Sequence, residues 1–77
     1  MRFWVLYDHT ESETRYYTTE RLAQASILAE IRHHRLHHSI DGWPEPGEAA
    51  THEACWAAYL ASHFGGTVSI TEAWFDD

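Results

Sequence analysis

The stretch that decides the fold is Arg2-Phe3-Trp4-Val5-Leu6-Tyr7-Asp8. Aromatic and β-branched residues of this kind are typical of strands, so we predict a β-strand over residues 2–8. Successive side chains of a strand point to opposite faces. One face would carry Phe3, Val5 and Tyr7, and the other Trp4 and Leu6. Because both faces are apolar, we expect this strand in the centre of a sheet.

Two further strands are predicted from the sequence on either side of a helical region. Residues 10–14 are rich in Thr, Ser and Glu and indicate a turn, and residues 15–18 then form a second strand of an antiparallel hairpin. Over residues 67–75, apolar Val68 and Ile70 alternate with small polar residues, which is typical of a half-buried strand.

The middle of the chain has the periodicity of helices. A first helix is expected from Thr19 to His38, with Leu22, Leu28 and Leu36 on its apolar side. Two prolines and two glycines within residues 41–47 predict a loop. A second helix is then expected over residues 48–64, ending at the Gly65-Gly66 pair.

The predicted order of elements is therefore β-β-α-α-β within a single domain, residues 1–77. We expect an α+β fold: a three-stranded antiparallel sheet with two antiparallel helices packed on one face. Two helices can cover only one face of such a sheet, so its second face is predicted to be open.

This open face is the predicted partner-binding surface. We expect Trp4, Leu6 and Phe75 there, with Tyr16 or Tyr17 beside them. Acidic residues would border it: Glu11, Glu13, Glu72 and Asp76. Three occupants are considered: a foreign protein, a second copy of the chain, or the chain's own loop around Trp43.

Charge and cysteine content restrict the classes of function. The formal net charge is −7 with no lysine, which argues against general nucleic-acid binding, because that needs a basic face. The single cysteine, Cys55, excludes an internal disulfide framework and suits a reducing compartment. No signal peptide or membrane span is visible, so we expect a cytoplasmic protein.

Four of the seven histidines lie within residues 33–38. If the helices are antiparallel, His34 and His38 would meet His52 and Cys55, a set that can hold zinc. His33 and His37 are equally well spaced. The simpler interpretation is that these histidines are solvated at a helix C-terminus, where positive charge is favoured. We therefore commit to no cofactor.

Catalysis is not expected. Cys55 with His52 is the one pair with the chemistry of a nucleophile and base, and no glycine-rich oxyanion or phosphate-binding loop accompanies it.

In size, charge and expected architecture the whole chain resembles the small acidic inhibitors of phages and mobile elements, among them anti-CRISPR proteins. This class-level resemblance includes no motif and assigns no functional residue. It implies a protein that binds a larger host complex and blocks it sterically. The alternative is a small homodimeric accessory domain that binds metal through the histidine-rich helix end with His52 and Cys55.

Overall fold

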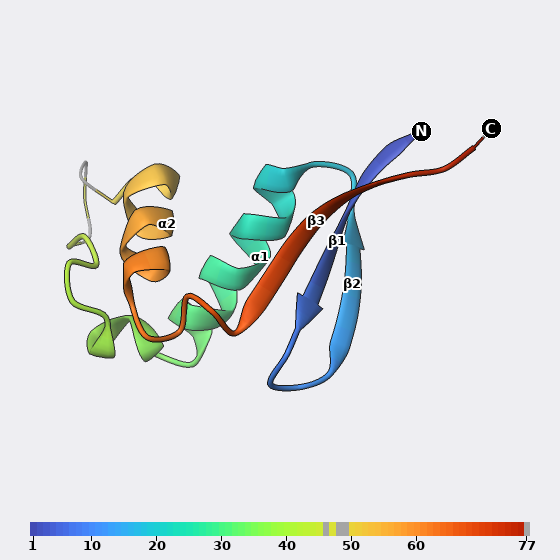
Figure 1. Ribbon diagram of the computed structural model, residues 1–77. Helices are drawn as coiled ribbons and strands as arrows, with labels where there is room; N and C mark the ends of the chain where they lie inside the picture. Colours follow the sequence, from blue (N-terminus) through green and yellow to red (C-terminus); the bar gives the residue numbers. More distant parts are fainter. Residues whose placement is uncertain (46, 48–49, 77) are drawn as a thin grey trace.

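The computed structural model of the protein describes residues 1–45, 47 and 50–76. Its elements, in order, are β1 (Arg2–Asp8), β2 (Glu13–Tyr17), α1 (Glu20–His33), the 3-10 helix η1 (Leu36–Ser39), α2 (His52–Ala61) and β3 (Val68–Trp74) (Figure 1). The predicted α+β fold and the order β-β-α-α-β are confirmed.

The sheet has the strand order β2-β1-β3 with both pairings antiparallel, so β1 is the central strand as expected. The β1–β2 turn is closed by the Asp8 carboxylate, which accepts from the backbone N–H groups of Thr10 and Glu11 at 2.9 and 3.1 Å. Ser12 takes a left-handed conformation, with φ of 53°, where the chain re-enters β2.

Helix α1 is shorter than predicted. It begins where the Thr19 hydroxyl accepts from the N–H of Leu22 at 3.1 Å, and it ends at His33 rather than His38. Arg35 lies in the left-handed region, with φ of 58°, so the α-helix cannot continue through it. The residues that follow form η1 instead.

Helix α2 is also shorter than predicted. The Thr51 hydroxyl caps it by accepting from Ala54 N–H at 3.1 Å, and Glu48, its predicted start, lies outside the described residues. The Ser62 hydroxyl donates to the Tyr59 carbonyl and accepts from Phe64 N–H, which ends the helix before the glycine pair.

The two helices form successive layers on the sheet. Helix α1 contacts all three strands, and α2 packs against α1 (Figure 1). Their relative direction differs from the antiparallel expectation, because both helices begin at the same end of the molecule (Figure 1). The hydrogen-bonded pairs Arg21–Glu53 and Gln24–His52 join their first turns. The early end of α1 leaves a long connection through η1 that returns the chain to this end.

The core lies between the sheet and the helices. Its buried residues are Leu6, Ala23, Ile27, Leu28, Ile31, Ile40, Cys55, Ala58 and Tyr59. Leu6 is completely buried, so its expected place on the open face is wrong. Side chains alternate along β1, and therefore Trp4 also lies on the helical side, in register with Tyr17 and Glu72.

The open face consequently carries the other set of β1 side chains. By register these are Phe3, Val5 and Tyr7, flanked by Thr14 and Tyr16 of β2 and by Ser69, Thr71 and Ala73 of β3. None of these side chains is charged at neutral pH. The predicted apolar open face therefore exists, but the β1 side chains on it are Phe3, Val5 and Tyr7 and not Trp4 and Leu6.

Candidate functional site

An aromatic cluster occupies one end of the open sheet face. The Phe3 ring stacks on Phe75 with centroids 4.6 Å apart, and lies 6.1 Å from the ring of Tyr16. The backbone holds this end together, since Phe75 N–H donates to the Met1 carbonyl at 2.8 Å. Tyr16 is 68% exposed and Phe75 is 61% exposed, which is unusual for neighbouring aromatic side chains on one face.

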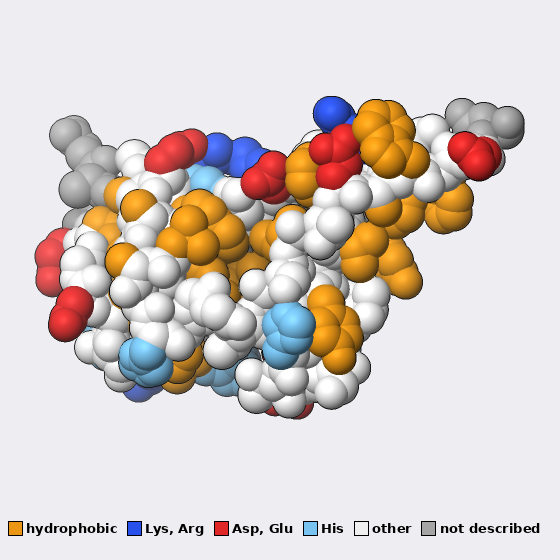
Figure 2. Space-filling model, viewed as in Figure 1, with side chains coloured by type: hydrophobic (Ala, Val, Ile, Leu, Met, Phe, Trp, Pro, Cys, Tyr) orange, Lys and Arg blue, Asp and Glu red, His pale blue; other side chains and the backbone are white. Residues whose placement is uncertain are grey.

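These side chains surround an open hollow of about 490 Å³, which we call the sheet groove. It is lined by Met1, Phe3, Tyr16, Tyr17, Thr18 and Phe75. Figure 2 shows hydrophobic side chains gathered where the sheet projects beyond α1. The sheet groove combines large aromatic rings with few polar atoms, which is the composition of a protein-binding anchor site.

The predicted acidic border is not assembled around this groove. Glu13 and Glu72 lie on the helical side by register, where they pair with Arg15 at 3.5 Å and Arg2 at 3.7 Å. Glu11 is in the β1–β2 turn, and exposed Asp76 follows Phe75. Strand alternation therefore places Glu13 and Glu72 on the face of the sheet opposite to Phe3 and Tyr16.

Of the predicted anchor residues, the structure places Phe75, Tyr16 and its alternative Tyr17 at the groove. The sequence interpretation missed Phe3 and Tyr7. The signal for them was the pairing of β1 with β3. The large apolar residues of β3 are Val68, Ile70 and Trp74, and they lie opposite Asp8, Leu6 and Arg2 on the helical side.

Trp43 does not cover the open face. It packs against the core beside the helices, and the Arg32 guanidinium lies 5.7 Å from the centre of its ring. Its imidazole neighbour is His37, at 6.0 Å between ring centres.

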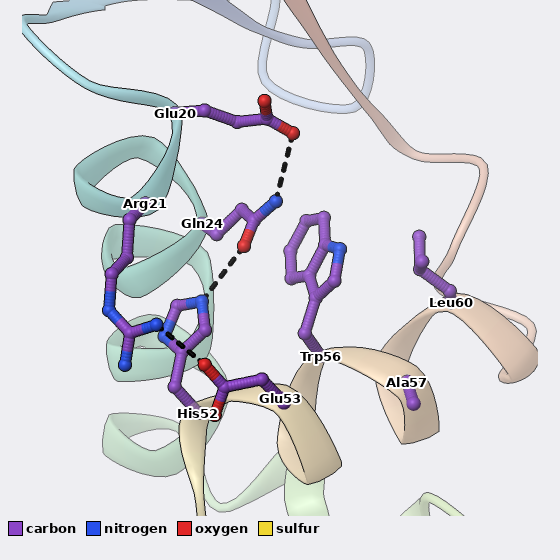
Figure 3. Close-up of a pocket in the computed structure, with 8 residues that line it drawn as sticks. All are labelled: Glu20, Arg21, Gln24, His52, Glu53, Trp56, Ala57 and Leu60. Atoms are coloured by element: carbon purple, nitrogen blue, oxygen red, sulfur yellow. Dashed lines mark hydrogen bonds and ion pairs between the residues drawn. The ribbon is translucent and has the colours of Figure 1, made fainter.

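A second hollow, which we call the helix groove, lies between α1 and α2 and has a volume of about 440 Å³. Its lining residues are Glu20, Arg21, Gln24, His52, Glu53, Trp56, Ala57 and Leu60 (Figure 3). The Trp56 indole stacks on buried Tyr59 at 5.0 Å between ring centres, so one of its faces is covered by the core. Figure 3 shows the indole between Gln24 and Leu60.

Hydrogen bonds fix the polar side of the helix groove. Gln24 Nε2 donates to the Glu20 carboxylate at 3.1 Å, and its Oε1 lies 2.8 Å from His52 Nε2. Because an amide oxygen can only accept, His52 Nε2 carries the proton. Arg21 donates to Glu53 at 2.7 Å, and this bond holds the pKa of Glu53 below its ordinary value.

The proposed zinc ligands are not brought together. His52 bonds to Gln24, whereas the Cys55 thiol is completely buried and accepts from Arg32 Nη2 at 3.3 Å. His34 and His38 lie after the end of α1, on its C-cap and in η1. Within residues 1–45, 47 and 50–76, no three His, Cys, Asp or Glu side chains form a group suited to a metal ion.

The chain matches no protein-family model, and the comparisons with curated proteins and with solved structures found no match. In the described part of the chain, no helix is both long enough and apolar enough to cross a membrane.

Proposed function

We propose that this protein is a small protein-binding module whose open sheet face docks on a larger protein. The observation that carries the proposal is the sheet groove, where exposed Tyr16 and Phe75 flank the half-buried ring of Phe3. Aromatic side chains held in place by their neighbours lose little conformational freedom on binding. Such residues dominate the energy of many interfaces.

The chemistry of the partner follows from the charge of the chain. The formal net charge is −7, while the open face itself carries no charged side chain within β1, β2 and β3. The open face is uncharged and the rest of the protein is acidic, which favours a partner with an apolar patch surrounded by basic residues. In such a complex the charged groups of both proteins stay in solvent at the rim, and no charge has to be buried. Surfaces that bind nucleic acid have this character.

Within this proposal, the resemblance to anti-CRISPR proteins and related inhibitors gives a mode of action. The protein would act by occupying a basic docking surface of a host complex. No observation in the structure favours the alternative, a metal-binding accessory domain, because its four proposed ligands lie apart.

The test is affinity capture from a lysate of the organism that encodes the protein, with three baits in parallel. These are wild type, Tyr16→Glu, which puts a charge into the sheet groove, and Ala29→Glu, which adds the same charge at an exposed position of α1. A partner captured by wild type and Ala29→Glu but lost with Tyr16→Glu is expected. It must also bind as a purified protein.

Two results would overturn the proposal. One is a purified partner that binds Tyr16→Glu as tightly as wild type. The other is a wild type that light scattering shows to be a dimer, with Tyr16→Glu a monomer and no foreign protein captured. In that case the sheet face serves a second copy. Circular dichroism of Tyr16→Glu checks that folding is unchanged, as expected for a side chain that is 68% exposed.

A further inference from the structure

We propose that the helix groove binds an arginine side chain of the partner, between the Trp56 indole and the Glu20 carboxylate. This extends the proposed function by a second contact, since the helix groove and the sheet groove share no lining residue. It also specifies which basic group the partner offers.

The aromatic wall is the first reason. Tyr59 covers one face of the Trp56 indole, and the side chain is nevertheless only half-buried because it lines the groove. Tryptophan is the best aromatic partner for a cation placed over its ring. The guanidinium of arginine is planar and weakly hydrated, so it stacks on such a ring more readily than a lysine ammonium.

The carboxylate of Glu20 is the second reason. In the described part of the chain it accepts one hydrogen bond, from the neutral amide of Gln24, and forms no ion pair. The other charges of the groove are balanced, because Arg21 and Glu53 neutralise each other at 2.7 Å. Glu20 therefore places a negative charge, paired with no described cationic side chain, beside an apolar, aromatic hollow (Figure 3).

The neighbouring side chains hold these two groups in place. Gln24 is itself bonded to both Glu20 and His52, so the carboxylate side of the groove spans both helices. On the other side, Ala57 and Leu60 leave space beside the indole for the methylene groups of an arginine side chain. A carboxylate acceptor and an aromatic face are the two groups that a guanidinium recognises.

The experiment titrates N-acetyl-arginine methylamide into the ¹⁵N-labelled protein and follows the indole N–H signal of Trp56 by NMR. The matched neutral probe is N-acetyl-citrulline methylamide, which has nearly the same shape without the charge. The arginine probe is expected to bind saturably, with a dissociation constant on the order of 10 mM, because one exposed cation–π contact and one exposed ion pair are both weak. The citrulline probe is expected to give no saturable shift.

Two variants separate the site from general attraction to an acidic protein. Glu20→Gln is expected to weaken binding about threefold, whereas Glu11→Gln, which removes an equal charge from the β1–β2 turn, leaves it unchanged. Equal weakening by both variants, or equal binding of citrulline, would overturn the inference. Tyr16→Glu should bind the arginine probe like wild type, so failure here is distinguishable from failure of the proposed function.

Discussion

Tyr59 carries one of three buried side-chain polar atoms that lack a hydrogen-bond partner in the described part of the chain. It is only 2% exposed, and its hydroxyl has no hydrogen-bond partner among the described residues. Burial raises the pKa of this hydroxyl above its ordinary value, an effect that the nearby Thr67 opposes and Asp8 reinforces. A buried polar group without a partner reduces the free energy of unfolding.

Tyr59→Phe is therefore expected to stabilise the protein by about 1 kcal/mol at pH 7, measured by urea unfolding. Above pH 10 the advantage should grow. The wild-type hydroxyl ionises more easily in the unfolded chain than in the fold. This difference leaves the wild-type free energy of unfolding unchanged below about pH 10 and lowers it as the pH rises further, whereas phenylalanine has no such loss. Tyr16→Phe, at a 68% exposed position, is the control and should change little at either pH. A destabilised Tyr59→Phe would show that the hydroxyl has a partner.

Which face of β1 is buried could not be predicted from β1 alone. Phe3, Val5 and Tyr7 are as apolar as Trp4 and Leu6. The alternation along β1 therefore does not show which of the two sets faces the helices. The information lies in the register with β3, where Ile70 pairs with Leu6. Register depends on the turn and on the connection through both helices, and local sequence patterns do not fix these.

Among the elements, the end of α1 offers a direct test of backbone strain. Arg35 has φ of 58°, a conformation that costs an L-residue about 1–2 kcal/mol and glycine almost nothing. Arg35→Gly is expected to raise the free energy of unfolding by about 0.5–1 kcal/mol, after allowing for the greater freedom of glycine in the unfolded chain. Thermal or urea unfolding measures the change.

The matched control is Arg35→Ala, which removes the same charge but keeps the β-carbon. It should give no gain in stability. If alanine and glycine stabilise equally, the effect comes from charge near the helix end and not from the left-handed backbone.

The existence and order of the three strands and two α-helices followed from the sequence, but η1 did not, and the ends and buried sides of the elements followed only in part. Leu28 is buried as predicted, whereas Leu22 is 51% exposed and Leu36 is 38% exposed. The buried stripe instead includes Ala23, Ile27 and Ile31, spaced four residues apart. Alanine is only weakly hydrophobic, so it contributes little to the periodicity that marks a buried face. The early end of α1 depends on the left-handed conformation of Arg35, and arginine does not favour that conformation.

For the whole molecule, the net charge of −7 predicts how association should respond to salt. Long-range attraction to a basic partner raises the association rate, whereas buried anchors such as Tyr16 mainly set the dissociation rate. Raising the salt concentration from about 0.1 M to about 1 M shortens the screening distance from about 10 Å to about 3 Å.

With the partner identified by affinity capture, surface plasmon resonance is expected to show a salt-dependent fall in the association rate. Tyr16→Ser should instead raise the dissociation rate, with little change in the salt dependence. An association rate that is independent of salt would contradict a basic partner.

At this scale the candidate site was the least predictable part. An open, apolar sheet face followed from counting elements, because two helices leave one face uncovered. The acidic border did not follow, since Glu13 and Glu72 project to the helical side and pair with arginines there. The helix groove was unforeseen, because it requires both helices to begin at the same end.

The central position of β1 also determines when the sheet can be completed during synthesis. Its neighbour β2 follows within a few residues, but its other neighbour, β3, comes after both helices, and even the nearest β1–β3 partners are Asp8 and Val68. Until the ribosome has released residues 68–74, one edge of an apolar strand has no hydrogen-bond partner, and such edges pair readily with other chains. For the nascent protein, the most hydrophobic strand thus keeps one unpaired edge until β3 has been synthesised.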